Sequence, residues 1–334
     1  MAAGYDLVGR DRAAALYQAI QKTSGAIDQL LADEFGPEYR FQIYARLVHH
    51  YTDLNAARLL IEFGNVWLSD ARYCNDRREI EQARAVIRHE FGDIMSSGAI
   101  TPPAGPAITL QPQESTALNS VWNGYDASFP DLVAFVCCLC AGNGGLTRPQ
   151  DILSQWRAYG SNGNGGCVSF TAGGIERAIS KNPNSPPNPQ QREDGFLFEP
   201  VLYEDRHQKG LVRALTFEAV ERARRTGSNI DVPGLIDALL MISPLMKHLG
   251  FKEEHEWRIV LLPRFAASPI APKFRARPDL LVPFVDIESV LQRRLSVAEV
   301  MVGPSNIPEL NEQAMRRVPN APATILKSEI PYRI

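Results

Sequence analysis

The chain has 334 residues, of which 45% are apolar and 22% charged, and its formal net charge is −3 at pH 7. These proportions are those of an ordinary globular protein, so they exclude collagen-like, coiled-coil and wholly disordered chains. Because basic and acidic residues nearly balance, the chain lacks the positive charge that favours nucleic acid, and we expect no nucleic-acid partner.

No part of the sequence predicts a membrane segment or a signal peptide. The longest strongly apolar stretch, residues 132–141, is far short of the ~20 residues that a membrane-spanning helix needs. Among five cysteines, Cys137, Cys138 and Cys140 lie in one apolar run without the spacing of a zinc site. We therefore expect a cytoplasmic protein with reduced, buried cysteines and no metal.

The chain begins with a predicted helical extension over residues 1–40, because apolar residues form a helical stripe over 12–35. Residues 41–48 then alternate between apolar and polar side chains. This alternation predicts a half-buried strand that ends at the polar residues 49–52.

A helix and a second strand follow directly. Asp53 or Thr52 can cap a helix over 54–63, and Gly64 suits the left-handed position that ends it. A short strand is expected over 66–69. The sequence therefore predicts a strand–helix–strand unit with polar residues at its junctions.

Further elements alternate along the rest of the chain: a charged helix over 77–92, a buried strand over 133–140, a helix beginning at Pro149, strands over 167–170, 199–203 and 255–262, helices over 209–226 and 233–249, strands near 280–285, 299–302 and 323–327, and a helix over 308–317. Long loops are expected near 96–131 and 182–195, where proline is frequent. This order predicts an α+β fold in one large domain over 41–334.

The glycine run over 160–166 is the first feature to test for nucleotide binding. It does not match G-x-G-x-x-G, and it precedes a strand rather than a helix. We interpret it as a flexible turn, and a ligand-contacting loop is the alternative.

Polar residues near the predicted strand ends are candidates for a ligand site. His50, Tyr51 and Thr52 leave a buried strand, although a histidine there also commonly satisfies a backbone carbonyl. Asn75 follows the next short strand, although asparagine is equally common in turns.

A second group combines aromatic and basic side chains on one predicted helix. Trp156 and Tyr159 share a face and offer a stacking surface, and Arg157 offers a charged fork for phosphate. The same spacing is typical of residues that anchor a helix to the core.

Two acidic residues open the apolar strand over 255–262. Alternation places Glu254 and Glu256 on one face and Trp257 on the other. Glu256 at the edge of a core is unusual unless it is paired or functional. A carboxylate bridged to an arginine is the alternative.

Taken in order, these pieces resemble the bacterial family known as domain of unknown function 2971. The likeness runs from about Tyr44 to about Pro304. It rests on the following motifs: His50-Tyr51-Thr52, Gly64-x-Val66-Trp67-Leu68-Ser69, Asn75-Asp76, Ser154-Gln155-Trp156-Arg157-x-Tyr159-Gly160 and Glu254-x-Glu256-Trp257-Arg258. The family name itself implies no chemistry.

The same order of elements is also similar to ADP-ribosyltransferases of the His-Tyr-Glu type. That resemblance implies a split or mixed central sheet and NAD as a substrate. It further implies that His50 contacts the adenosine-side ribose, that Glu256 grips the nicotinamide ribose, and that Tyr159 or Trp156 stacks on nicotinamide. The pair Glu254-x-Glu256 resembles the two-acid version found in transferases that modify side chains.

The chemistry implied by the second resemblance is coherent. Cleavage of the nicotinamide–ribose bond builds positive charge on the ribose, as in glycoside hydrolysis, and a nearby carboxylate stabilises that charge. Arg157 or Arg258 is expected to hold the pyrophosphate. We therefore expect an NAD-consuming ADP-ribosyltransferase or NAD glycohydrolase, acting as a defence or toxin effector on an unidentified macromolecular acceptor.

Two alternatives belong to other classes. The first is a non-catalytic sensor or interaction module that binds a nucleotide in the same place. The second, a nuclease or nucleic-acid-modifying activity, rests on the arginines at 72, 77, 78 and 84. Because these alternate with acidic residues, a solvated helix face accounts for them better.

Overall fold

The computed structural model describes residues 46–74, 79–103, 105–142, 148–188, 191–277, 280–305 and 307–332. The predicted helical extension over 1–40, the first residues of the predicted strand over 41–48, and Asn75 lie outside the described residues. None of the described helices is long and apolar enough to cross a membrane.

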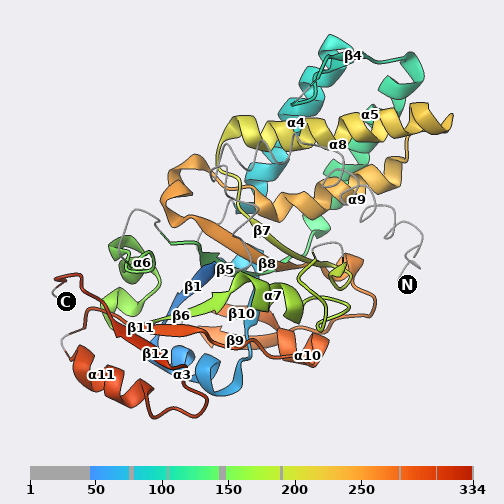
Figure 1. The fold of residues 1–334 in the computed structure, drawn as a ribbon. Helices are drawn as coiled ribbons and strands as arrows, with labels where there is room; N and C mark the ends of the chain where they lie inside the picture. Colours follow the sequence, from blue (N-terminus) through green and yellow to red (C-terminus); the bar gives the residue numbers. More distant parts are fainter. Residues whose placement is uncertain are drawn as a thin grey trace. The chain divides into compact units, whose positions relative to one another are not determined.

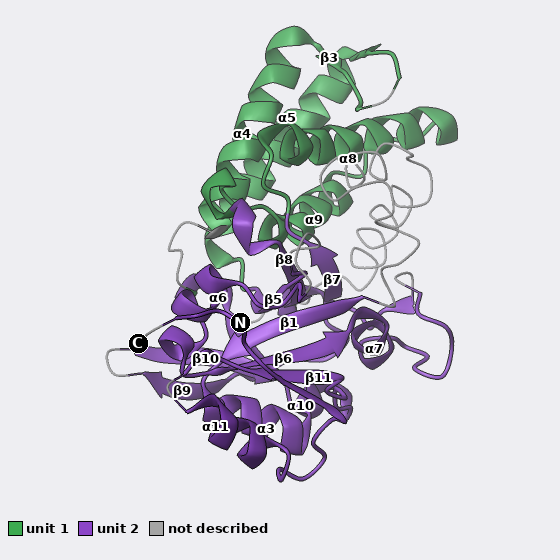
Figure 2. Ribbon diagram, turned by 60° about the vertical axis from the view of Figure 1, so that its left-hand side comes forward, with its two compact units in different colours: residues 1–40, 74–133, 202–251 green, residues 41–73, 134–201, 252–334 purple. Residues whose placement is uncertain are grey.

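The chain divides into two compact units, although the sequence predicts a single domain over 41–334 (Figure 2). Each unit is assembled from segments that lie far apart in the sequence. Unit 1 comprises residues 1–40, 74–133 and 202–251, and unit 2 comprises residues 41–73, 134–201 and 252–334.

Among the residues of unit 1 that the structure describes, four helices contact one another (Figure 1). They are α4 (Glu79–Ser97), α5 (Pro112–Ser128), α8 (Asp205–Thr226) and α9 (Val232–Ile242). A two-stranded hairpin, β3 (Ala99–Ile100) with β4 (Ile108–Thr109), joins α4 to α5. The predicted helices over 77–92 and 209–226 are confirmed.

The long loop expected near 96–131 is wrong, because α5 occupies much of it. Pro112 lies at the first helical position, where its missing N–H costs nothing. Glu114 accepts a hydrogen bond from the backbone N–H of Gln111 at 2.7 Å and so closes the first turn. Prolines that suggest a loop thus begin a helix.

Unit 2 is built around a ten-stranded sheet. Its strands are β1 (Leu47–Thr52), β2 (Trp67–Asp70), β5 (Phe135–Cys140), β6 (Gly166–Thr171), β7 (Phe196–Pro200), β8 (Glu256–Leu261), β9 (Lys273–Arg277), β10 (Leu280–Asp286), β11 (Glu299–Val302) and β12 (Thr324–Lys327). The pair β11–β12 is parallel, and the other ladders within this sheet are antiparallel. The expected α+β fold with a mixed sheet is confirmed.

Strand β5 is the branch point of the sheet. One of its edges pairs with β8 along the whole strand. The other edge pairs with β2 at Phe135 and Val136, and with β1 at Cys140. We call the opening between β1 and β2 on this edge the fork. From the fork, one wing continues through β6, β11 and β12, and the other through β10 and β9.

In the described part of unit 2, the helices that accompany the sheet are α3 (Leu54–Phe63), α6 (Leu153–Ala158), α7 (Ala172–Ala178), α10 (Ile287–Leu291) and α11 (Pro308–Met315). Helix α3 follows the prediction in detail. The Asp53 side chain accepts a hydrogen bond from the backbone N–H of Ala56, and Gly64 ends the helix at φ +61°. Short 3₁₀ turns cover Ala71–Tyr73, Phe129–Asp131, Ser161–Gly163, Ser243–Leu245, Leu249–Glu254 and Pro263–Phe265.

Candidate functional site

The two faces of the unit 2 sheet differ in chemistry. Residues paired directly across a ladder share a face, so the register assigns each side chain to one side. The face that we call the polar face carries Trp67 and Ser69 of β2, His49 and Tyr51 of β1, Cys138 and Cys140 of β5, Glu256 and Arg258 of β8, and Lys273 and Arg275 of β9. The opposite face is mainly apolar and buried.

His50 lies at the fork. Its Nδ1 is 3.0 Å from the carbonyl oxygen of Cys138, on the edge of β5 that β1 has just left. The ring therefore satisfies a backbone carbonyl, which is one of the two roles expected for it. It lies inside β1, which ends at Thr52, within the polar residues 49–52 where the sequence predicts the end of the strand.

The charge state of His50 follows from its surroundings. Burial lowers its pKa, the hydrogen bond to Cys138 raises it, and the positive charge of Arg275 lowers it, with a net decrease below 6.5. A neutral ring that donates from Nδ1 presents Nε2 as a hydrogen-bond acceptor. An acceptor in that position suits a sugar hydroxyl.

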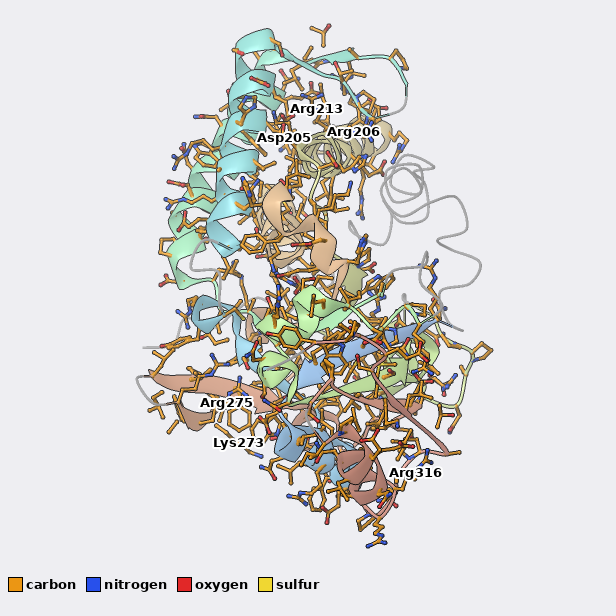
Figure 3. All side chains as sticks on the ribbon, turned by 90° about the vertical axis from the view of Figure 1, so that its left-hand side faces the viewer. Asp205, Arg206, Arg213, Lys273, Arg275 and Arg316 are labelled. Carbon is orange, nitrogen blue, oxygen red and sulfur yellow. The ribbon has the colours of Figure 1, made fainter. Side chains whose placement is uncertain are left out.

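Arg275 belongs to a cluster that the sequence does not predict. It donates to the Ser69 hydroxyl at 2.8 Å, and its guanidinium carbon lies 5.9 Å from the centroid of the Trp67 ring. Trp67 is 41% exposed and stacks on Phe284 with centroids 4.5 Å apart. Lys273 and Arg275 both extend from β9 (Figure 3). The alternating pattern Lys-x-Arg-x-Arg in β9 is the sequence signal that could have predicted this basic cluster on one face of a strand.

Tyr159 and Glu254 are brought together as a pair. The Tyr159 hydroxyl donates to Glu254 Oε1 at 2.9 Å, and both side chains are half-buried. The hydroxyl thereby fixes the orientation of the carboxylate, so Tyr159 acts on an acid of the predicted site.

Glu254 and Glu256 do not share a strand face as predicted. Glu254 ends a 3₁₀ turn, and His255 between them adopts φ +43°, which breaks the alternation before β8 begins. Left-handed backbone is uncommon outside glycine, although histidine is among the residues enriched there. Burial, with a smaller contribution from Lys252, lowers the pKa of His255.

Glu256 and Arg258 form a buried ion pair. Their side chains are 3% and 1% exposed, and Arg258 donates to the two carboxylate oxygens at 2.6 and 3.1 Å. A carboxylate bridged to an arginine is therefore present, as the alternative interpretation holds. Arg258 is buried and engaged by this carboxylate, so the structure gives its predicted role on a pyrophosphate no support.

Tyr51 and Trp156 belong to the core rather than to a ligand site. Their rings meet edge to face at 4.9 Å, and the Trp156 indole N–H donates to Asp151 at 2.8 Å. The Tyr51 hydroxyl donates to the Gln150 carbonyl. Both are buried in a cluster with Cys140, Cys167 and Met301. Because both side chains are buried, the structure gives their predicted ligand contacts no support, and Trp156 is the core anchor that its helical spacing also allows.

Two other predicted contacts lie elsewhere in unit 2. Thr52 ends β1, and its carbonyl oxygen is so close to Gly165 that a Cβ there would clash. Glycine is therefore required in this turn, because the backbone of Gly165 approaches that of Thr52 closely.

Arg157 is exposed, with its guanidinium carbon 5.0 Å from the centroid of the Tyr332 ring. Its phosphate role stays a prediction.

Comparison with known proteins gives one match. The model of the family described as protein of unknown function (DUF2971) matches residues 155–259. This segment includes Tyr159, Glu254 and Glu256 but neither the fork residue His50 nor Trp67. No curated protein and no solved structure is significantly similar to the chain. Residues 155–259 therefore carry the DUF2971 pattern that the sequence predicts for them.

Proposed function

We propose that unit 2 binds NAD at the fork and cleaves its nicotinamide–ribose bond. The observation that carries this proposal is the fork itself, with His50 inside it and the positive charge of Arg275 close enough to lower the pKa of His50. A nucleotide needs a hydrogen-bond acceptor for a ribose hydroxyl, a cation for its diphosphate and an aromatic surface for a base. His50, Arg275 and the half-exposed Trp67 supply these groups.

The chemical step requires a carboxylate near the nicotinamide ribose. The bond between the ribose carbon and the nicotinamide nitrogen breaks, and its electron pair leaves with nicotinamide. The positive charge on the ribose is then stabilised by an anion until water or a nucleophile of the acceptor forms the new bond. We assign this role to Glu254, because Tyr159 orients it, whereas Glu256 is held in an ion pair with Arg258.

The biological setting follows from the reaction. An enzyme that depletes NAD deprives a cell of an essential redox cofactor, which suits a defence or toxin effector. We keep that setting, with a cytoplasmic location and a macromolecular acceptor, as part of the proposal.

Nicotinamide release tests the activity. The purified full chain is incubated with NAD, with and without cell extract as a source of acceptors, and nicotinamide is measured by chromatography. Glu254→Gln is expected to reduce the rate about 100-fold or more, because it removes the negative charge that stabilises the transition state. Glu253→Gln, an exposed neighbour, is the matched control and should keep the rate. An absence of nicotinamide release, or full activity of Glu254→Gln, would overturn the proposal.

One observation favours a second candidate, a nucleotide-binding module without catalysis. Glu256, the acid predicted to act on NAD, is neutralised by Arg258 in the core. Calorimetry with NAD separates the two functions. Binding that is weakened by Arg275→Gln, with all NAD recovered intact afterwards, would support the module and exclude the enzyme.

A further inference from the structure

We propose that helix α4 of unit 1 carries a binding site for a divalent transition-metal ion, formed by His89, Glu90 and Asp93. Each residue offers one ligand atom, and these atoms all lie within 4.8 Å of one another. This site is independent of the function proposed for unit 2.

The spacing of the ligand atoms fits one ion. His89 Nδ1 lies 3.2 Å from an Asp93 oxygen and 3.6 Å from Oε1 of Glu90. Zn²⁺ binds nitrogen and oxygen at about 2.1 Å, so neighbouring ligands of a tetrahedral ion lie about 3.4 Å apart. The two distances from His89 Nδ1 bracket that value, and the Glu90 and Asp93 oxygens lie within 4.8 Å of each other, so small side-chain rotations of the exposed ligands suffice to bring the three atoms around a common centre.

Glu90 supplies the observation that points to a ligand. Its side chain is fully buried, yet Oε1 is a buried oxygen without a hydrogen-bond partner. The other carboxylate oxygen accepts a hydrogen bond from Nε of Arg213. An unsatisfied buried oxygen is costly, and carboxylates of this kind are normally paired or bound to a metal. The unsatisfied oxygen is the one that lies beside His89.

Arg213 holds the Glu90 carboxylate in a fixed orientation. It lies on α8, which contacts α4 within unit 1, and Figure 3 labels it there. By holding Oε2, Arg213 fixes the Glu90 carboxylate with Oε1 available to an ion. Metal-binding side chains are commonly oriented in this way by a second hydrogen-bonding partner.

The remaining ligands are accessible to an ion in solution. The side chains of His89 and Asp93 are 55% and 54% exposed, and their i, i+4 spacing places them on one face of α4. The ion would therefore bind with one buried and two exposed ligands, and water would complete its coordination. The sequence suggests no metal, because a site of this kind contains no cysteine.

The ligand set selects the class of metal. Imidazole nitrogen favours zinc, cobalt, nickel and copper, whereas magnesium and calcium prefer oxygen ligands alone. One imidazole and two carboxylates therefore favour Zn²⁺ or Co²⁺ over Mg²⁺ at equal concentration.

Titration of the full chain with Zn²⁺ tests the site by calorimetry and thermal melting. We expect one ion per chain, and a rise in Tm of about 5 °C at a hundredfold excess of zinc over Kd. Mg²⁺ at the same concentration should leave Tm unchanged. Co²⁺ should give a weak visible spectrum without a thiolate charge-transfer band.

Three variants locate the ion. His89→Ala and Asp93→Asn are exposed changes that should each weaken Zn²⁺ binding at least tenfold, whereas His248→Ala removes an exposed histidine outside the site and should not. Glu90→Gln should also weaken binding, but it leaves Arg213 without its carboxylate, so its folding must be checked by circular dichroism. Equal Zn²⁺ affinity in His89→Ala and the unchanged chain, or a thiolate band with Co²⁺, would overturn the proposal.

Discussion

His49 is a buried histidine at the centre of the polar face of unit 2. It is 3% exposed, and its Nδ1 lies 2.8 Å from the hydroxyl of Ser169. Burial lowers the pKa of His49 to about 4 from the ordinary value of 6.5. The ring is therefore neutral in the folded protein at pH values where it is already protonated in the unfolded chain.

This difference predicts how stability depends on pH. Between pH 6.5 and pH 4 the unfolded chain binds the extra proton, so His49 makes the folded state progressively less stable as pH falls. The full effect is on the order of 3 kcal/mol and is reached near pH 4. Urea denaturation of the native chain and of His49→Asn, from pH 7 to pH 4, measures it. If both proteins lose stability equally over that range, His49 is not the cause.

The buried pair Glu256–Arg258 gives a second prediction at the residue scale. Glu256→Gln leaves the charge of Arg258 without this carboxylate, and the free energy of unfolding should fall by about 3–5 kcal/mol. The double variant Glu256→Gln, Arg258→Met should recover part of that loss, because it removes the buried charge. A double-mutant cycle by urea denaturation tests this, and additive losses would contradict the pairing.

Single residues also show where sequence reasoning reaches its limit. The sequence does not distinguish a carbonyl contact from a ligand contact for His50, because the outcome depends on where β1 leaves β5. The pattern Glu-x-Glu predicts a shared face only if the backbone is extended throughout. The left-handed conformation of His255 breaks that condition, and histidine gives no clear signal of it.

At the scale of elements, the C-terminal glycine of α3 shows how one position connects a helix to a strand. Gly64 has φ +61°, and a Cβ there would lie 2.5 Å from the carbonyl oxygen of Leu295. Gly227, which ends α8, has nearly the same φ of +63° but open space around it. A side chain at Gly227 would meet only backbone strain, whereas a side chain at Gly64 would meet both backbone strain and a steric clash.

Alanine substitutions should differ accordingly. Gly227→Ala should cost about 1–2 kcal/mol, the ordinary penalty of a left-handed residue with a side chain. Gly64→Ala should cost at least about twice as much, because the clash with a backbone atom is added. Thermal and urea denaturation measure both variants. Equal losses would show that Leu295 moves aside freely.

Most elements with strong periodicity could be predicted from the sequence, among them α3, β5, β8 and α8. Their capping residues or apolar runs are local signals. Strand β9 cannot be predicted in this way, because its basic residues and its exposed position at the end of the sheet hide the usual apolar pattern. The Pro-rich stretch before α5 predicts a loop although it begins a helix, because proline is common at both places.

At the scale of the whole molecule, the two units and the family segment do not coincide. Residues 155–259 begin in unit 2, pass through unit 1 at 202–251 and return to unit 2. The division could not be predicted from the sequence, because it depends on contacts between segments that are far apart in the chain. No linker composition marks the crossings.

This arrangement predicts that residues 155–259 will not fold alone. In the fragment, β6 loses both of its neighbours, β1 and β11, and β8 loses β5. The exposed strand edges should cause aggregation. Expression of the fragment beside the full chain, followed by size-exclusion chromatography and thermal melting, tests this. A soluble fragment with a cooperative melting transition would contradict it.

The branch at β5 has a consequence for how the two wings of the sheet can vary. Strands β1, β6, β11 and β12 take their register from one end of β5, and β2, β10 and β9 take theirs from the other. An insertion that shifts pairing in one wing therefore leaves the ladder of the other wing unchanged. One wing brings His50 to the fork, and the other brings Trp67 and Arg275. Substitutions in one of these groups can therefore occur without changing the other, although both wings pair with β5.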